Sequence, residues 1–443
     1  MADPLVLEDG SHIAVVGGGP AGSFFSIFAL KMAKLVGKYL RVTIYEPKDF
    51  TKGGPLGCNR CGGVISELLV QTLAVEGIIL TDRLVQRGIN TYRLHTAYGS
   101  VSIEAPSNEK RIATVYRGGG PKGAVGKEKE SFDGYLLDLA KKEGAAHLPV
   151  KIDRIEFKDS KPVLYSKGDD VQEADLVVGA IGIKSRTSGL FENMRFGYRK
   201  PGTITAAIAE IGLDRDMVSE HFGASVNLFL LPIKGMKFAA IIPKGNYVTV
   251  CILGNNVSAG SMDEFLRHPV VLSVLPAGIG AYRVDCRCLP EMNVRPPQTP
   301  FADRVVVCGD AGSTRLFKDG LGAAYLMGKA AAKTAVLHGA GAHHFENEYL
   351  PAYRSLAWDN RYGQVLFSVT DLFKRYRLLG RGMVRVVAKE QEGPQRAKTL
   401  SSILWDMFTG NERYRNIFFR TLNVPMQLDL LRESAKGMLV GEA

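Results

Sequence analysis

The amino-acid sequence predicts an α/β fold with a doubly wound parallel sheet, a second domain built on an inserted antiparallel sheet, and a mostly helical C-terminal tail. Three observations lead to this prediction. A strand, helix, strand pattern opens the chain, short strand-like runs separated by turns fill its middle, and helical sequence follows residue 346. Because 443 residues exceed the usual ceiling for one hydrophobic core, we expect two or more units built from interleaved segments.

The first strand and the first helix are joined by a glycine-rich turn. Apolar residues at 12–16 predict the strand, and residues 23–36 predict a helix that is mostly buried. Between them, Gly17, Gly19 and Gly22 have the spacing of a dinucleotide-binding turn. In such a turn Gly17 makes the bend, Gly19 lets the backbone approach a pyrophosphate, and Gly22 allows close helix packing.

The residues around this turn complete the expected site. Pro20 and Ala21 would open the helix whose N-terminus holds the phosphates. Residues 41–45 predict the second strand, and Glu46 at its end is placed to accept hydrogen bonds from a ribose. The pattern therefore predicts a bound dinucleotide, and on these residues alone both NAD and FAD stay open.

The middle of the chain mixes several element types. We expect a loop at 53–63, a helix at 64–73 and paired strands within 91–103, and then a helix at 132–142 that leads to strands at 151–157 and 174–178. Strand-like runs at 225–231, 237–242 and 247–253 predict the antiparallel sheet. A buried strand at 304–308 and a small-residue helix at 323–337 precede the tail.

Two later segments resemble the p-hydroxybenzoate hydroxylase-like group of FAD enzymes. Gly309 and Asp310 end the 304–308 strand as in that group, where the aspartate binds the ribityl chain. Gly320, Leu321 and Gly322 then open a helix whose N-terminus would face the flavin. The resemblance implies FAD rather than NAD, and non-covalent FAD because no histidine or cysteine lies in a recognised attachment motif.

Two further segments resemble the group with departures from its pattern. Residues 175–186 correspond to the middle motif, but Ile181 and Gly182 stand where the group usually has Asp-Gly, which weakens the hypothesis of a hydroxylase that uses NADPH directly. Arg117 corresponds to an arginine that lies immediately before the helix and flanks the cofactor, although here residues 118–130 intervene before the 132–142 helix. The resemblance implies that Arg117 binds phosphate or flavin, and a surface arginine is the alternative.

The segment 58–63, Cys-Asn-Arg-Cys-Gly-Gly, resembles the Cys-Gly-Gly segment of geranylgeranyl reductases, which lies beside the flavin ring. The resemblance makes Cys61 the candidate catalytic residue and places Gly62 and Gly63 against the cofactor. The alternative role for Cys61 is a small residue that packs under the ring. Unpaired thiols are expected for the cysteines of this chain. The alternatives are a structural zinc site formed by Cys58, Cys61, Cys286 and Cys288, or a reversible disulfide between Cys58 and Cys61.

This resemblance also implies a function and a division into domains. We expect a Rossmann-like FAD-binding domain from 10–63, 104–195 and 296–345, a substrate domain from 64–103 and 196–295, and a helical C-terminal region at 346–443. The activity implied is reduction or dehydrogenation of a C=C bond in an apolar, prenyl or lipid-like substrate, with an unidentified electron donor or acceptor. A flavin monooxygenase and a non-catalytic prenyl-binding escort are the alternatives.

The substrate pocket and the charge of the chain bear on the partners. Geranylgeranyl reductases carry a Tyr-x-Trp-x-Phe-Pro strand, and the similar strand at 238–243 has the smaller Ala240 and Ile242, so the substrate need not be an isoprenoid.

A formal charge of +11 favours an anionic partner. No nucleic-acid-binding motif is present, so we expect no nucleic acid partner. No secretory signal is readable, and a cytoplasmic protein is expected.

Residues 373–389 interleave basic and apolar side chains without an acidic residue. This pattern is typical of an amphipathic helix on an anionic membrane surface. It also fits a tail helix that packs its apolar side on the core and leaves its arginines in water. The sequence leaves both possibilities open. No group of histidines resembles a metal site.

Overall fold

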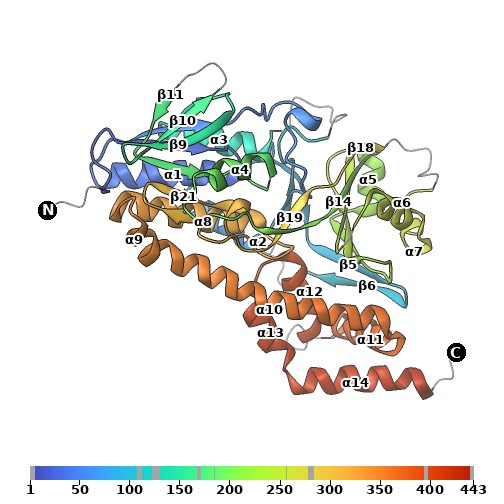
Figure 1. Cartoon of the computed structure of the whole chain (residues 1–443). Coiled ribbons are helices and arrows are strands. Elements are labelled where there is room, and N and C mark those ends of the chain that lie inside the picture. Colours follow the sequence, from blue (N-terminus) through green and yellow to red (C-terminus); the bar gives the residue numbers. More distant parts are fainter. Residues whose placement is uncertain are drawn as a thin grey trace. The chain divides into compact units, whose positions relative to one another are not determined.

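The structure of the chain is a computed structural model that describes residues 5–106, 112–121, 130–166, 171–183, 185–255, 257–277, 284–393 and 398–439. It divides into two compact units, each assembled from three separate segments. Unit 1 contains Met1–Lys52, Glu130–Thr203 and Glu291–Trp358, and unit 2 contains Gly53–Lys129, Ile204–Pro290 and Asp359–Ala443. In unit 1, strands from the blue, green and orange parts of the chain lie side by side (Figure 1).

Unit 1 is built on a six-stranded sheet. Its order is β20 (Phe301–Ala302), β21 (Val305–Val307), β12 (Leu176–Gly179), β1 (His12–Val16), β2 (Arg41–Tyr45) and β8 (Ala146–Leu148). All pairs are parallel except the short edge strand β20. β1 is buried along its whole length, as expected of a central strand covered on both faces.

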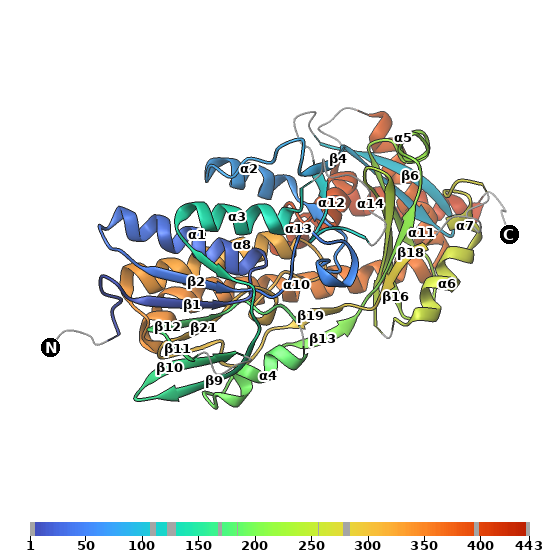
Figure 2. The same cartoon turned by 90° about the horizontal axis from the view of Figure 1, so that it is seen from above.

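Different elements cover the two faces of this sheet (Figure 2). The helices α1 (Pro20–Leu35), α3 (Phe132–Glu143) and α8 (Gly320–Lys333) pack together on one side. On the other side, a small antiparallel sheet of β9 (Ile152–Lys158), β10 (Lys161–Ser166) and β11 (Val171–Glu173), together with α4 (Ser185–Asn193), encloses a core of aliphatic and aromatic side chains. The predicted doubly wound α/β architecture is confirmed.

Unit 2 is built on a seven-stranded sheet. Its order is β18 (Val284–Cys288), β14 (Ala207–Gly212), β17 (Tyr247–Gly254), β16 (Met236–Pro243), β15 (Ser225–Leu230), β5 (Thr91–Thr96) and β6 (Gly99–Glu104). Every pair is antiparallel except β15 with β5. The predicted strands at 225–231, 237–242 and 247–253 therefore form the centre of a mostly antiparallel sheet.

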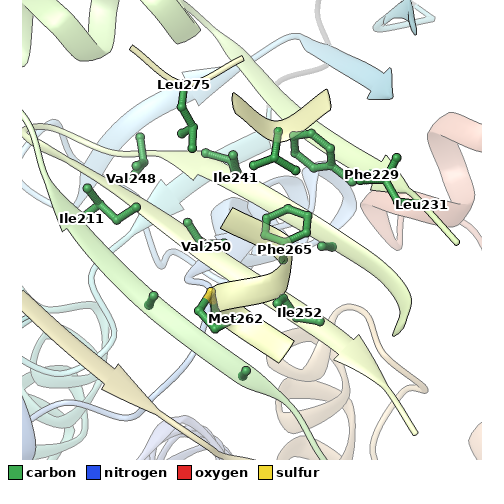
Figure 3. Close-up of a cluster of buried hydrophobic side chains, with 14 of the residues drawn as sticks. Ile211, Phe229, Leu231, Ile241, Val248, Val250, Ile252, Met262, Phe265 and Leu275 are labelled. Atoms are coloured by element: carbon green, nitrogen blue, oxygen red, sulfur yellow. The ribbon is translucent and has the colours of Figure 1, made fainter. Parts of the chain in front are cut away.

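One face of this sheet carries a dense hydrophobic core (Figure 3). Side chains such as Ile211, Ile241 and Val250 alternate along their strands toward this face. They pack against α5 (Arg215–Phe222), α6 (Ala259–Arg267) and α7 (Pro269–Leu272), which contribute Phe222, Phe265 and Val271 to the cluster.

The intervening positions point to the opposite face, which we call the Cys251 face. Strand register groups Ile208, Glu210, Ala240, Ile242, Thr249 and Cys251 there. At one end of β16, Phe238 stacks on Phe367 of α10 (Leu350–Arg375) with ring centroids 5.5 Å apart. It also meets Phe408 of α12 (Thr399–Thr409) edge-on. The C-terminal tail is thus part of the core of unit 2.

The remaining elements of unit 2 surround this sheet. A three-stranded sheet contains β3 (Val64–Ile65), β7 (Ile112–Val115) and β4 (Val85–Ile89), and α2 (Glu67–Val75) follows β3. The helix α11 (Arg377–Glu392) packs between β6 and α14 (Val424–Leu439), while α13 (Tyr414–Thr421) packs near α12. No helix among the described residues is long and apolar enough to cross a membrane.

The observed units differ from the expected domain boundaries in several places. Residues 196–203 and 291–295, expected in the substrate domain, group with unit 1. Residues 53–63 and 104–129, expected in the FAD-binding domain, group with unit 2. The physical reason is strand pairing, because β7 lies between β3 and β4. The tail expected at 346–443 is not a separate body, since it divides after Trp358 between the two units. The helix expected at 64–73 begins only at Glu67, after two residues of strand.

Candidate functional site

The glycine-rich turn of unit 1 is shaped by backbone contacts that leave no room for side chains. Gly17 has φ of +109°, and a Cβ there would lie 2.3 Å from the carbonyl oxygen of Ala180. A Cβ on Gly22 would lie 1.9 Å from the carbonyl oxygen of Gly17. These two glycines are therefore required by the turn itself.

Gly19 differs from Gly17 and Gly22 because, apart from its own chain neighbours, no atom of the described residues lies within 4 Å of the position its Cβ would take. It is the N-cap of the 16-residue helix α1, which has Pro20 at its first position, no side-chain cap and no acidic residue in its first turn. The first-turn N–H groups of such a helix have no intrahelical acceptor, and the helix dipole favours an anion there. The open space beside Gly19 fits a pyrophosphate at this point.

Glu46 follows β2 and is tied to the same turn. Its Oε2 accepts a hydrogen bond from the Gly18 N–H at 3.0 Å, and its Oε1 accepts one from the Lys48 N–H at 2.9 Å. These bonds fix the carboxylate beside the turn. A carboxylate has further lone pairs that can accept from ribose hydroxyls.

The Gly309-Asp310 segment comes to the same edge of the sheet. It directly follows β21. β21 pairs with β12, and β12 pairs with β1, in both cases in parallel. Gly309 has φ of +68°, and a Cβ there would lie 2.6 Å from the Cβ of Ala21, so this segment touches the first turn of α1. Asp310 is exposed. A side-chain carboxylate at this edge is accessible to a ligand.

The N-terminus of α8 lies beside Asp310. A Cβ on Gly320 would lie 3.8 Å from the Asp310 Oδ1, and Leu321 is buried. Gly322 donates its N–H to the Oδ1 of Asp319 at 3.2 Å, which caps the helix. Unit 1 thus brings together all of the predicted cofactor residues except Gly62, Gly63 and Arg117.

Two features of this region were not predicted from the sequence. Asn293 donates through its side-chain amide to the carbonyl oxygens of Asp310 at 2.9 Å and Gly312 at 3.0 Å, which holds the loop after β21 in place. The buried Ser313 hydroxyl has no hydrogen-bond partner among the described residues. Buried hydroxyls usually have a partner, so this oxygen is suited to a polar group of a ligand in the same loop region.

Cys61, Gly62 and Gly63 lie in unit 2, where Gly62 packs against the Cys251 face. A Cβ on Gly62 would lie 3.0 Å from the Ile242 side chain and 3.3 Å from the Cys251 sulfur. Gly63 has φ of +67°, and its Cβ would lie 2.2 Å from the carbonyl oxygen of Val115. The expected pocket strand, now β16, and the Cys-Gly-Gly segment are therefore in contact.

Arg117 belongs to the same part of unit 2. It is half-buried, and its carbonyl oxygen accepts a hydrogen bond from the Asn59 N–H at 3.4 Å. Arg60, between Asn59 and Cys61, has φ of +50°. Such a conformation is uncommon outside glycine and is found at functional sites more often than elsewhere.

None of the four cysteines that could form a metal site or a disulfide is in a disulfide bond. Cys286 and Cys288 lie opposite Glu210 and Ile208 on the Cys251 face. Burial, reinforced by the Cys58 thiol, raises the pKa of Cys288 to about 12. Among the described residues, no three or more His, Cys, Asp or Glu side chains form a group that could hold a metal ion.

A buried ion pair that was not predicted from the sequence lies on the Cys251 face. The Lys244 Nζ is 4.0 Å from the Glu210 Oε1, and the Thr249 hydroxyl donates to the Glu210 Oε2 at 2.7 Å. The same ammonium would lie 3.3 Å from a Cβ on Gly63. Burial raises the pKa of Glu210 against the opposing effects of Lys244 and Thr249. The sequence feature that could have indicated this pair is the charged Glu210 inside the otherwise apolar run 207–211.

Comparison with known proteins bears on the fold. No protein-family model matches the sequence, and no curated protein matches it. Solved structures do match. A geranylgeranyl bacteriochlorophyll reductase-like protein from Thermoplasma acidophilum is 17% identical with a TM-score of 0.56, covering 97% of each chain.

Two further structures represent other chemistries. The p-nitrophenol 4-monooxygenase PnpA from Pseudomonas putida DLL-E4 is 14% identical with a TM-score of 0.60, over 92% of this chain and 100% of that one. A mutant of the halogenase PltM in complex with FAD is 12% identical with a TM-score of 0.61, over 92% of this chain and 85% of that one. The chain therefore has the fold of these flavoproteins, as the resemblance drawn from its glycine and Gly-Asp motifs predicts.

Proposed function

We propose that the chain is an FAD-dependent oxidoreductase. One observation carries this proposal: the Gly17–Gly22 turn, Glu46, Asp310 and the N-terminus of α8 gather at one edge of a single parallel sheet. An NAD enzyme needs only the first two of these features. Flavoproteins of the same fold, one of them in complex with FAD, support the proposal.

Each part of FAD has a matching group in this arrangement. The N-terminus of α1 beside Gly19 would hold the pyrophosphate, and Glu46 would hold the adenosine ribose. Asp310 and the first turn of α8 would hold the ribityl chain and the flavin. Bound FAD would supply hydride transfer, while the protein supplies orientation and the exclusion of water.

We further propose an apolar substrate whose C=C bond is reduced or formed, and we propose the Cys251 face of unit 2 as a surface that binds it. Ala240, Ile242 and Cys251 are buried apolar side chains on that face, and Gly62 packs against Ile242 and Cys251. Reduction of a C=C bond needs a proton as well as a hydride. Glu210, whose pKa is raised by burial, and its partner Lys244 are the acidic groups proposed to supply that proton, with Cys61 as the alternative.

The test begins with the purified protein, its bound cofactor and the Asp310→Ala variant. We expect a yellow protein that releases intact FAD on denaturation, and a variant that binds FAD more weakly by about 1 to 3 kcal/mol. Isothermal titration of the apoprotein with FAD measures the change. A colourless protein that FAD does not reconstitute would favour an escort-like protein without catalytic activity.

A flavin monooxygenase is the second candidate, because a p-nitrophenol monooxygenase shares the fold. The two activities are separated by identifying lipids and small molecules that copurify with the protein and supplying them to chemically reduced enzyme. A reductase converts the substrate without oxygen to a saturated product. A monooxygenase forms product only after oxygen is admitted, and that product carries an added oxygen atom.

A further inference from the structure

The helix α10 presents a stripe of exposed apolar side chains on the part that belongs to unit 2. Val365, Val369 and Leu372 are 48%, 41% and 45% exposed, and Tyr376 just beyond the helix is 51% exposed. Their spacing of three and four residues places them on one side of the helix. The core of unit 2 is packed by the other side, which includes the buried Phe367.

The stripe continues onto α13, which lies beside α10 (Figure 1). The ring of Tyr362, one turn before Val365, lies 5.4 Å from the ring of Phe418 and 6.1 Å from that of Phe419. Phe419 is 51% exposed. Two helices therefore share one continuous apolar surface that faces solvent.

Exposed arginines border this surface. Arg361 lines an open groove together with Val365, Val369 and Leu372. The Arg415 guanidinium lies 5.9 Å from the centre of the Phe419 ring. We call Arg361, Val365, Val369, Leu372, Arg415 and Phe419 the α10–α13 surface.

The acidic side chains nearby are held by groups of the protein itself. Asp359 is buried and accepts hydrogen bonds from the backbone N–H groups of Tyr414 and Arg415. Asp371 forms ion pairs with Lys374 and Lys237, and these two cations lower the pKa of Asp371 although its partial burial opposes them. The α10–α13 surface is thus apolar at its centre and positively charged at its border.

The neighbouring segment 373–389 is arranged differently. Met383, Val386 and Val387 are buried, because α11 packs between β6 and α14. The Lys374 ammonium donates to the carbonyl oxygens of Met236 and Lys237. The apolar side of α11 is therefore occupied by the protein's own core, whereas α10 and α13 carry exposed apolar side chains.

We propose that the α10–α13 surface docks on an anionic lipid bilayer, with its apolar side chains in the interface and Arg361 and Arg415 on lipid headgroups. Charge favours this partner over a second copy of the chain. A two-fold interface would place the same surface against itself and bring these arginines together. A bilayer accepts an exposed apolar stripe and neutralises the arginines. The proposal does not depend on bound FAD.

The experiment compares sedimentation of the full-length protein with phosphatidylcholine vesicles that contain or lack phosphatidylserine. We expect binding to the anionic vesicles that weakens with salt. Val365→Asp/Val369→Asp should reduce it at least about tenfold, because it removes apolar contact area and adds negative charge. Arg361→Glu/Arg415→Glu should also reduce it about tenfold or more. The matched control is Val75→Asp, since Val75 is 87% exposed on α2, away from this surface.

Specific outcomes would overturn the proposal. These are absence of binding to anionic vesicles, equal binding to both vesicle types, or an equal loss in Val75→Asp and in the double aspartate variant. Light scattering on the same samples tests for self-association. A wild-type dimer that the double aspartate variant converts to monomer, without vesicle binding, would assign the surface to a second copy. FAD content measured in parallel separates a failed docking proposal from a failed cofactor proposal.

Discussion

At the scale of single residues, the glycines of the 17–22 turn have different surroundings. Gly22 is confined by the Gly17 carbonyl, whereas Gly19 faces open space. The first constraint belongs to the protein, and the second fits a ligand that approaches the backbone, as proposed. The motif predicts these roles from the sequence, and the surrounding atoms identify which backbone groups confine Gly17 and Gly22.

The distinction predicts opposite phenotypes for two substitutions. Gly22→Ala should lower the free energy of unfolding by about 2 kcal/mol or more, because its Cβ meets backbone that cannot move freely. Gly19→Leu should leave stability within about 0.5 kcal/mol of wild type, and should abolish FAD binding by filling the pyrophosphate position. Urea denaturation of the apoproteins and titration with FAD measure both effects. Stoichiometric FAD in Gly19→Leu would show that the cofactor does not bind there.

The Glu210–Lys244 pair is a second feature visible only at this scale. Lys244→Met removes the cation from a buried carboxylate, which costs about 3 to 5 kcal/mol when the carboxyl is ionised. Burial raises the Glu210 pKa, so in folded protein the carboxyl keeps its proton to higher pH than in unfolded protein. The loss should therefore be smaller at pH 5 than at pH 8.

Glu210→Gln/Lys244→Met is the matched control, because it removes both charges and keeps the hydrogen bond to Thr249 possible. Its stability should lie closer to wild type and vary less with pH than that of Lys244→Met. Urea unfolding at the two pH values decides the matter. Equal losses in the single and double variants, at both pH values, would mean that the pair has no electrostatic role.

At the scale of elements, local patterns predicted most helices and strands but not their partners. The strands at 225–231, 237–242 and 247–253 could be predicted because each is a short, mostly apolar run and turns separate them. The strand at 64–65 could not be predicted, because two residues are too few to show an alternating pattern and because its partner β7 lies far along the chain. The tail was readable as helical, but its contribution of Phe367 and Phe408 to the sheet core was not.

The packing of α8 on α1 is an element-scale feature with a direct test. A Cβ on Gly328 would lie 3.0 Å from the Ala21 carbonyl oxygen and 3.1 Å from the Phe25 nitrogen. Gly328→Ala should therefore push α8 away from α1, destabilise the protein and weaken FAD binding through its shifted N-terminus. Gly189 in α4 has open space, so Gly189→Ala should instead stabilise by about 0.5 to 1 kcal/mol. Thermal unfolding and FAD titration of both variants give the comparison, and stabilisation by both would contradict it.

At the scale of the whole molecule, the two units share one chain that passes between them five times. Neither unit is a continuous piece of sequence, so the ends of each inserted segment are held by the other unit. If one unit unfolds, these ends are released, and the other unit must close longer loops from its three segments at an added entropic cost. Connectivity therefore couples the stability of the two units. The positions where the chain passes from one unit to the other could not be predicted from the composition of the sequence.

This coupling predicts that a ligand of unit 1 stabilises unit 2. Trp405 is buried in unit 2, where it meets Tyr92 edge-on with ring centroids 5.3 Å apart, whereas Trp358 is 57% exposed. In a Trp358→Phe variant, tryptophan fluorescence reports on unit 2 alone. FAD at 100 times its dissociation constant should stabilise the folded state by about 2.7 kcal/mol, and Trp405 should register that shift in urea. The Gly19→Leu substitution, added to this variant, should remove the shift while leaving the Trp405 transition in place. A Trp405 transition that FAD does not move, in protein shown to bind it, would mean that the units unfold independently despite their interleaved chain.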